Sequence, residues 1–357
     1  MAFVLLAAGE RGWRALARSG MDDLDGARWI WAEGVAAADG PVAFYAVRDF
    51  ELAAPARSAS LSVMADEEYV AYVNRRQIGS NRYTNGGTLD GYEVADELVV
   101  GANRLILELR SSRGLGGALA ALRIDSEAGA VEIVTDAGWQ VLRRHRRRIF
   151  DGRPVGGRPA RVWGSPPIGR WGRVGERVAR PVLSDLAPDL FARRPRRFAY
   201  WRVGRGWSGR RYPPGRLHGF GTPVLFDWGK KVTGYLALSY EIEESRPALA
   251  ILSVGEKPPD PPFAVPNEFL IGVPGRTLWT AARPRTFRYV LVEGLPEVSG
   301  ATVVVTKKAL GAELEVSPDE VEKGVFGRRS PRLRSPVENE LRRRLQSLES
   351  RSVGEDG

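Results

Sequence analysis

The sequence predicts an all-β protein in which two antiparallel β-sandwich domains are joined by a long linker. Short stretches of β-branched and aromatic residues, many alternating with polar ones, fill residues 42–142 and return after residue 223. Turn-forming residues such as Asn85-Gly86-Gly87 separate several of these stretches, and a sustained helical period is scarce. Several short strands divided by turns are typical of a sandwich or a barrel.

The first sandwich is predicted over residues 27–142. Its strands are expected at 42–50, 59–65, 69–74, 104–110, 118–124, 131–135 and 139–142, with one helical turn at 96–100. Trp29, Phe50 and Trp139 stand where strands begin or end, and we expect each of them in the core because large aromatic side chains mostly bury.

The second sandwich is predicted over residues 223–310, with strands at 223–227, 233–242, 248–254, 286–293 and 301–306. The segment 233–242 alternates cleanly between a polar and an apolar face, as a half-buried antiparallel strand does. Tyr289 is expected in the core of this domain. Residues 311–357 are interpreted as a polar C-terminal tail with a short charged helix at 338–349.

The composition excludes several kinds of chemistry. Cysteine is absent, which excludes disulfides, thiolate nucleophiles and cysteine metal sites, and histidine occurs only at positions 145 and 218. We therefore expect no metal and no cofactor. No apolar stretch reaches the ~7–15 residues of a secretory core or the ~20 residues of a membrane span, so we expect a cytoplasmic protein without a membrane partner. Residues 1–26 are interpreted as an N-terminal extension.

Basic residues gather in the segment 143–222, which is predicted to be a linker that packs on both domains. The net charge of the chain is +10, and residues 143–217 alone hold 21 arginines and four acids. Nucleic acid would need these arginines together with exposed indole rings. A charge run is usually a solvated face, however, and we expect Trp163, Trp171, Trp201 and Trp207 to be buried. The sequence therefore disfavours nucleic acid as a partner.

A series of short motifs, in order, resembles the front half of a known family. They are Ala-Arg-Trp-Ile-Trp at 27–31, Val-Arg-Asp-Phe at 47–50, Ala-Asp-Glu-Glu-Tyr-Val-Ala-Tyr-Val-Asn at 65–74, Ile-Gly at 78–79, Leu-Val-Val-Gly-Ala-Asn at 98–103 and Thr-Asp-Ala-Gly-Trp at 135–139. Together they resemble the N-terminal galactose-binding-like jelly-roll domain of bacterial α-L-rhamnosidases. Residues 224–235, 254–256 and 283–290 are similar to the β-domain that follows it in that family.

Two departures from the family pattern bear on function. The family's strand turn is Tyr-x-Asn-Gly, whereas this chain has Asn74-Arg75, so the turn is expected to be strained or of another type. The family's catalytic carboxylates lie in a helical (α/α) barrel after these β-domains, and here the chain ends soon after the last predicted strand. The resemblance therefore implies a non-catalytic protein; if it were active, it would be a glycoside hydrolase.

Two groups of polar and aromatic residues are candidate binding sites. In the first domain, the loops at one end are expected to offer a sugar site made of Asn81, Tyr83, Asn85, Tyr92 and Arg113. In the second domain, a polar site is expected at Asp227, Glu256 and Arg288. There, the structural alternatives are that Asp227 bonds the neighbouring turn and that Arg288 pairs with a carboxylate such as Glu256.

These observations support a carbohydrate-associated protein that binds glycan or accompanies a separate glycoside hydrolase. Two alternatives stay open: a structural or protein-interaction scaffold, and a truncated part of a split α-L-rhamnosidase. Fold resemblance alone does not decide among them.

Overall fold

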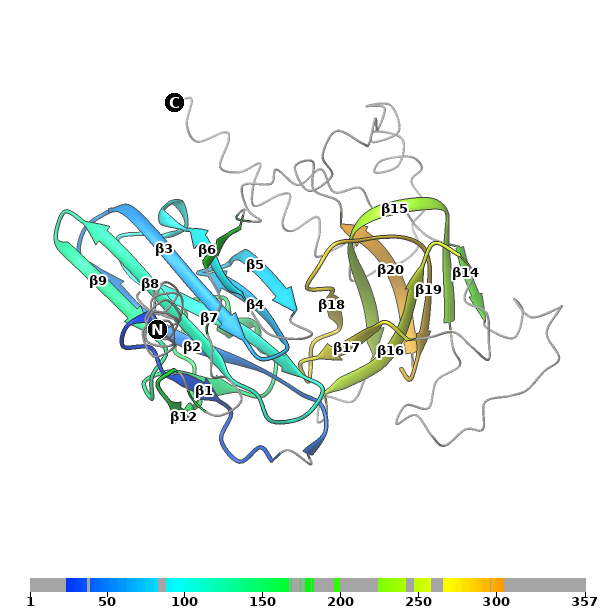
Figure 1. Cartoon of the computed structure of the whole chain (residues 1–357), viewed down its shortest axis with the longest axis horizontal. Helices are drawn as coiled ribbons and strands as arrows, with labels where there is room; N and C mark the ends of the chain where they lie inside the picture. The colour runs from blue at the N-terminus through cyan, green and yellow to red at the C-terminus, as the bar shows by residue number, and fades with distance from the viewer. Residues whose placement is uncertain are drawn as a thin grey trace, which may run out of the picture. The chain divides into compact units, whose positions relative to one another are not determined.

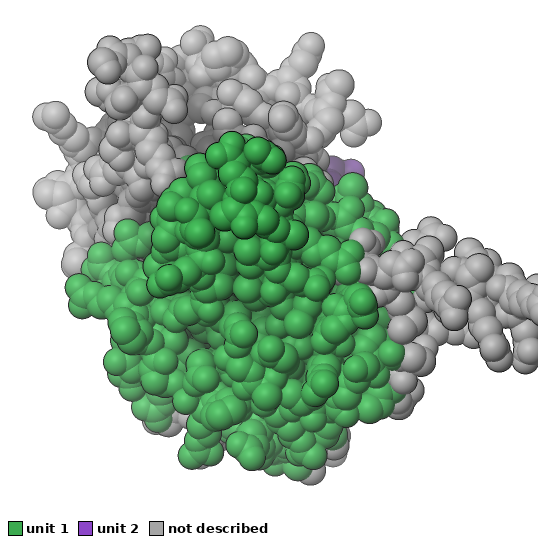
Figure 2. Space-filling model, turned by 90° about the vertical axis from the view of Figure 1, so that its left-hand side faces the viewer, with its two compact units in different colours: residues 1–185 green, residues 186–357 purple. Residues whose placement is uncertain are grey.

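The computed structural model describes residues 24–36, 39–82, 88–166, 168, 174, 177–180, 182, 196–199, 224–241, 247–257, 266–295 and 297–304. These residues are mostly strands, with two short 3-10 turns, η3 (Ala95–Glu97) and η4 (Arg147–Ile149). The predicted all-β class is confirmed. No helix in this part of the chain is long and apolar enough to cross a membrane. The chain divides into two compact units, residues 1–185 and 186–357 (Figures 1 and 2).

The first unit contains two sheets (Figure 1). A seven-stranded sheet has the order β12-β1-β8-β3-β6-β13, with β9 paired to β8, and a six-stranded sheet has the order β11-β10-β2-β7-β4-β5. The pairing of β13 with β6 is parallel, whereas the other pairs in these sheets are antiparallel. The strand bounds are β1 Trp29–Trp31, β2 Val42–Leu52, β3 Ala56–Ala65, β4 Glu68–Val73, β5 Arg76–Arg82, β6 Leu89–Glu93, β7 Gly101–Ser111, β8 Ala118–Ser126, β9 Gly129–Val134, β10 Gln140–Leu142, β11 Arg158–Pro159, β12 Arg161–Gly164 and β13 Arg177–Ala179.

The core of the first unit contains alternate residues from the central strands of both sheets. Phe44 of β2 and Leu107 of β7 meet Leu61 of β3 and Leu122 of β8 in one buried cluster. This period of two is what the sequence pattern predicts for strands that face a core on one side. The expected core aromatics Trp29, Phe50 and Trp139 are buried, and so is Tyr289 of the second unit.

The segment 143–222 contributes strands to both units. β12 pairs with β1 and β13 with β6 in the first unit, and β14 (Arg196–Ala199) pairs with β15 in the second. The first part of this segment thus completes the first unit. Trp163 is half-buried there, and its indole N–H donates to the Gly116 carbonyl at 3.2 Å. Trp171, Trp201 and Trp207 lie outside the described residues.

The second unit contains a sheet with the order β14-β15-β19-β16-β17, in which β18 and β20 also pair with β15. Its further strands are β15 Val224–Glu241, β16 Ala248–Gly255, β17 Glu268–Gly272, β18 Leu278–Thr280, β19 Arg285–Glu293 and β20 Glu297–Val304.

The prediction of two separate strands at 223–227 and 233–242 is wrong, because β15 runs through both. Its register against β19 shifts between Asp227 and Val232, and Gly229 has a φ of 76° there. Gly229 tolerates this left-handed conformation, so the ladder absorbs the irregularity as a bulge and continues.

The turn between β4 and β5 consists of Asn74 and Arg75. Asn74 has a φ of 54°, whereas Arg75 is not in the positive-φ region. The turn is therefore not type I′, which needs positive φ at both central positions. The Asn74 side chain donates to the Glu97 carbonyl at 2.8 Å and accepts from the Arg104 backbone N–H at 3.0 Å. These bonds hold Asn74 in the left-handed conformation.

Replacing Asn74 tests this account. Asn74→Ala removes the side-chain hydrogen bonds that offset the steric cost of a Cβ at positive φ. We therefore expect the free energy of unfolding to fall by about 2–3 kcal/mol. Asn74→Gly loses the same bonds but accepts the φ, so its loss should be smaller by about 1 kcal/mol. Urea unfolding of the full chain measures both. Equal losses in the two variants would contradict a conformational role for Asn74.

Candidate functional site

Two connections of the first unit meet at one end of the strands, named here the loop end. They are the β3–β4 turn at 66–67 and the β7–β8 connection at 112–117, and β5 also ends there, because Arg82 lies 3.7 Å from Glu67. The Ser112 backbone N–H and hydroxyl donate to the Glu67 carboxylate at 2.7 and 2.9 Å, and the Asp66 N–H donates to the Gly117 carbonyl at 2.7 Å. Glu67 has a φ of 88°, which is a strained backbone conformation for a residue other than glycine.

One buried carboxylate, that of Asp90, binds side chains from both sheets of the first unit. Asp90 of β6 has a fully buried side chain. Its Oδ2 accepts from the Tyr69 hydroxyl at 2.7 Å and from the Asn81 amide at 2.7 Å. Its Oδ1 accepts from Thr88 Oγ1 at 3.2 Å and from Arg180 Nε at 2.9 Å. The Asp90 cluster is these five residues together with Tyr92.

Tyr92 completes the Asp90 cluster through Tyr69. The two hydroxyls lie 2.7 Å apart, and both rings are buried. The ring of Tyr92 occupies the space beside Gly79, where an added Cβ would lie 2.3 Å from the ring carbon Cε1. Position 79 is therefore restricted to glycine while Tyr92 keeps its place.

Arg180 connects the Asp90 cluster to solvent, because its side chain is 40 % exposed. Burial would lower the pKa of Arg180, but the hydrogen bond to Asp90 and the charge of Asp90 raise it. Arg180 therefore stays charged and balances the carboxylate of Asp90.

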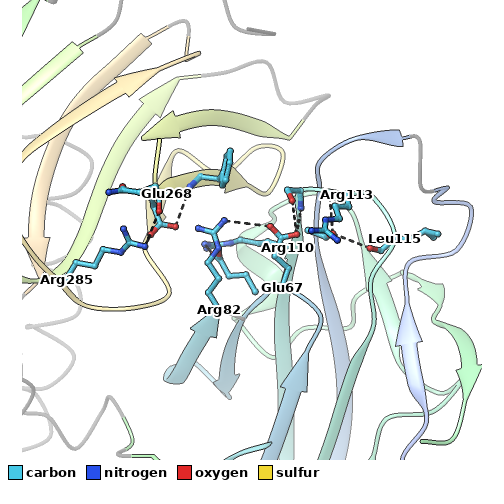
Figure 3. A network of polar contacts seen from close by, with 12 residues as sticks. Glu67, Arg82, Arg110, Arg113, Leu115, Glu268 and Arg285 are labelled. Carbon is cyan, nitrogen blue, oxygen red and sulfur yellow. Dashed lines mark hydrogen bonds and ion pairs between the residues drawn. The ribbon is translucent and has the colours of Figure 1, made fainter. Parts of the chain in front are cut away.

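A second ionic cluster lies on the other side of the same strands. Arg110 of β7 is buried and bonds two carboxylates: it contacts Glu68 of β4, and its Nη2 lies 2.5 Å from Glu108 Oε1. Arg82 lies 3.9 Å from Glu68 and 3.7 Å from Glu67 (Figure 3). Because neighbouring residues on a strand face opposite sides, Glu68 and Arg82 join this cluster while Tyr69 and Asn81 join the Asp90 cluster.

Burial raises the pKa of Glu68, and the charges of Arg110 and Arg82 oppose this without cancelling it. The ionised form of Glu68 is thus disfavoured in the folded protein relative to the unfolded chain.

The structure brings two of the predicted sugar-site residues together and leaves a third exposed. Asn81 and Tyr92 both belong to the Asp90 cluster, and both are buried instead of lying on a loop surface. Arg113 is exposed in the β7–β8 connection at the loop end. Tyr83 and Asn85 lie outside the described residues.

Sequence reasoning missed Asp90, Tyr69 and Arg180. The alternation of β6 could have indicated Asp90, since Asp90 and Tyr92 are two residues apart and share one face. Arg180 carries no such signal, because it is 90 residues from Asp90 in the chain.

In the second unit, the predicted polar site consists of two separate ion pairs. Arg288 binds Asp227 with two hydrogen bonds, of 2.8 and 3.2 Å, and lies over the Tyr289 ring at 4.8 Å. Glu256 pairs with Lys231 at 2.5 Å. Arg288 is therefore paired with a carboxylate, as expected, although its partner is Asp227 and not Glu256.

The pairing follows from the register of β15 and β19. Asp227 is opposite Tyr289, beside Arg288, and its carboxylate matches the planar guanidinium. The alternative that Asp227 bonds its own turn is confirmed, since its Oδ1 also accepts from the Gly229 N–H at 2.7 Å. Within the described part of the chain, no group of three or more acidic or histidine side chains is arranged to hold a metal ion.

Solved structures of two α-L-rhamnosidases and of a lectin are similar to this chain in fold. The α-L-rhamnosidase from Aspergillus terreus is similar over 80 % of this chain, with 15 % identity and a TM-score of 0.50. The α-L-rhamnosidase from Dictyoglumus thermophilum is similar over 79 %, with 15 % identity and a TM-score of 0.46. A lectin from Pleurotus ostreatus is similar over 78 % of this chain and 76 % of its own, with 14 % identity and a TM-score of 0.37.

The similarity covers only 36 % of each of the two enzymes. No family model matches the sequence, and no curated protein does. The resemblance to α-L-rhamnosidases inferred from the sequence motifs is thus confirmed at the level of the fold.

The raised pKa of Glu68 predicts a pH-dependent effect of Glu68→Gln. A raised folded-state pKa gives stability that is present below the unfolded value of about 4.5 and is lost as pH rises through the folded value. Glutamine resembles the protonated acid and does not titrate. We therefore expect Glu68→Gln to match the wild type in free energy of unfolding near pH ~4 and to exceed it near pH ~7.

Urea unfolding at the two pH values measures this, with Glu127→Gln as the control for the loss of one acidic group, because Glu127 is exposed. A Glu68→Gln variant that is less stable than the wild type at neutral pH would show instead that the ion pair with Arg110 outweighs the cost of burying the charge.

Proposed function

We propose that this chain is a non-catalytic, carbohydrate-associated β-sandwich protein that binds a glycan at the loop end of its first unit. The observation that carries the proposal is that the β3–β4 turn and the β7–β8 connection are joined at that end by the Glu67–Ser112 bonds, while Thr88, which precedes β6, bonds Asp90 of the Asp90 cluster. Ligand sites are commonly built from loops that a rigid scaffold positions. The similarity in fold to an α-L-rhamnosidase supports the carbohydrate class.

The side chains at this end suit a polar, neutral ligand such as a sugar. Arg113 presents an exposed guanidinium with five N–H donors, which can bond adjacent hydroxyls. Tyr83 and Asn85 add, in sequence, an aromatic ring and an amide to the segment between β5 and β6. The Asp90 cluster is held rigidly, because the four groups bonded to its carboxylate come from β4, from β5, from the residue before β6 and from the residue after β13.

The acidic residues near the loop end support a binding role over a catalytic one. Inverting glycosidases need two carboxyl groups ~6.5–9.5 Å apart that reach the sugar, and retaining enzymes need two at ~5–5.5 Å. Glu68 and Glu108 are at most 1 % exposed and share Arg110, and Asp90 is fully buried with its donors. We propose that these carboxylates hold the fold and do not touch substrate.

A glycan array followed by calorimetric titration tests the proposal. We expect the full chain to bind at least one neutral glycan, with rhamnose-terminated oligosaccharides as the first probes. Arg113→Ala and Tyr83→Ala should each weaken that binding by about tenfold, the loss expected for one or two hydrogen bonds to a charged or planar group. Arg57→Ala is the matched control, since Arg57 is exposed near the start of β3, away from the loop end.

Two results would contradict the proposal. One is the absence of binding to every glycan on the array, or binding that the Arg113 and Tyr83 variants leave unchanged. The other is turnover of an aryl α-L-rhamnoside that persists through purification and is abolished by changing one carboxylate, because this would make the protein an enzyme.

A further inference from the structure

Residues 143–153 form a segment, named here the arginine strap, that lies on the first unit away from its core. The strap contacts Tyr45 of β2, Tyr72 of β4 and Arg104 of β7. The residues on either side of these three, such as Phe44, Val73 and Leu105, belong to the core cluster. Because neighbouring strand residues face opposite sides, Tyr45, Tyr72 and Arg104 mark the outer face of the β2-β7-β4 sheet.

Aromatic packing fixes the strap on this face. The ring of Phe150 makes edge contacts with Tyr45 and Tyr72, at centroid distances of 5.6 and 5.1 Å. The Tyr45 hydroxyl lies 2.9 Å from His145 Nδ1, and Ile149 is fully buried. The apolar side chains of the strap therefore point into the protein.

Hydrogen bonds from Arg104 fix the strap backbone. Arg104 donates to the carbonyls of Arg148 at 3.2 Å, Ile149 at 2.9 Å and Arg153 at 2.9 Å, and it pairs with Asp49 at 2.8 Å. Arg75 donates to the Phe150 carbonyl at 3.2 Å. Four backbone carbonyls thus hold a short segment whose only helical turn is η4. A segment fixed in this way loses little conformational entropy when it binds a partner.

The strap presents positive charge that its surroundings do not neutralise. Arg143, Arg144, Arg146, Arg147, Arg148 and Arg153 are all exposed, and Asp151 is the one acid within the strap. Asp151 is shared between Arg75 and Arg147, and the Arg147 side chain is still 82 % exposed. Among the described residues, no carboxylate pairs with Arg144, Arg146 or Arg148. Like charges held together on a fixed backbone repel one another, so an anionic partner would relieve this repulsion.

We propose that the arginine strap is a binding surface for an acidic polysaccharide, recognised through its carboxylate or sulfate groups. Arginine binds such groups in a bidentate geometry and stays charged at every physiological pH. A polyanion offers several carboxylate or sulfate groups to these clustered arginines, whereas a single small anion offers one.

The geometry favours a polysaccharide over nucleic acid. Single-stranded nucleic acid is held by aromatic rings on which the bases stack, and the aromatic ring of the strap, Phe150, packs inward on Tyr45 and Tyr72. Reading duplex DNA in its major groove needs a helix or a β-ribbon, and the strap has a single three-residue turn. The strap thus offers positive charge but neither an exposed ring for stacking nor a helix or β-ribbon for the major groove.

The test is binding of the full chain to immobilised polygalacturonate, with neutral dextran and a DNA duplex as comparison surfaces. We expect the wild type to bind polygalacturonate and not to bind dextran. At the same salt concentration, it should bind DNA more weakly than polygalacturonate. The affinity should fall steeply between about 50 and about 200 mM salt, because bound counterions are released when charges pair. The triple variant Arg144→Gln, Arg146→Gln, Arg147→Gln should bind about tenfold more weakly or worse.

A second triple variant, Arg28→Gln, Arg57→Gln, Arg123→Gln, removes the same total charge from arginines outside the strap and should bind as the wild type does. Arg28 and Arg57 are exposed, and Arg123 is half-buried. Equal weakening by both triples would overturn the proposal, because binding would then follow net charge alone. So would no binding of polygalacturonate by the wild type, or tighter binding of the DNA duplex. Neither triple changes Arg113, so neutral-glycan binding at the loop end should persist in both and is tested separately.

Discussion

The buried carboxylate of Asp90 is the interaction on which the architecture of the first unit depends. It accepts from Tyr69 of β4 and Asn81 of β5 in one sheet, and from Arg180, which follows β13 in the other. A buried charge without partners is strongly destabilising, by about 3–5 kcal/mol when one partner of a buried pair is removed. The two sheets must therefore keep the spacing and register that bring these donors within hydrogen-bonding distance of Asp90.

Most of the fold could be predicted because core-facing apolar residues recur with a period of two along the central strands. In β2, β7 and β8 alternate residues face the core, as Leu105, Leu107 and Leu109 of β7 do. Among the strands that the prediction missed, β5 and β6 are rich in polar residues because Asn81 and Asp90 meet in the Asp90 cluster, while Ile78 and Tyr92 of the same strands reach the hydrophobic core. The strands of the segment 143–222 are short and pair with distant partners, which no local pattern encodes.

The candidate site was predictable to a lesser degree, for a physical reason. Asn81, Tyr92 and Arg113 could be named because amides, phenols and guanidinium groups near turns are typical of sugar sites. Whether such a group faces solvent or a buried carboxylate depends on a partner elsewhere in the chain, and for Asn81 and Tyr92 that partner is Asp90 with Tyr69. The arginines of residues 143–153 were interpreted as a solvated linker, although Arg104 and Phe150 hold them on a sheet.

A double-mutant cycle between Tyr69 and Asp90 measures the central interaction most directly. The free energy of unfolding of the full chain is determined by urea titration for Tyr69→Phe, Asp90→Asn and the double variant. Because the Tyr69 hydroxyl donates to Asp90 at 2.7 Å in a buried site, the account predicts a coupling energy of about 1–3 kcal/mol. Additive losses, within about 0.3–0.5 kcal/mol, would show that the two residues act independently and would contradict the account.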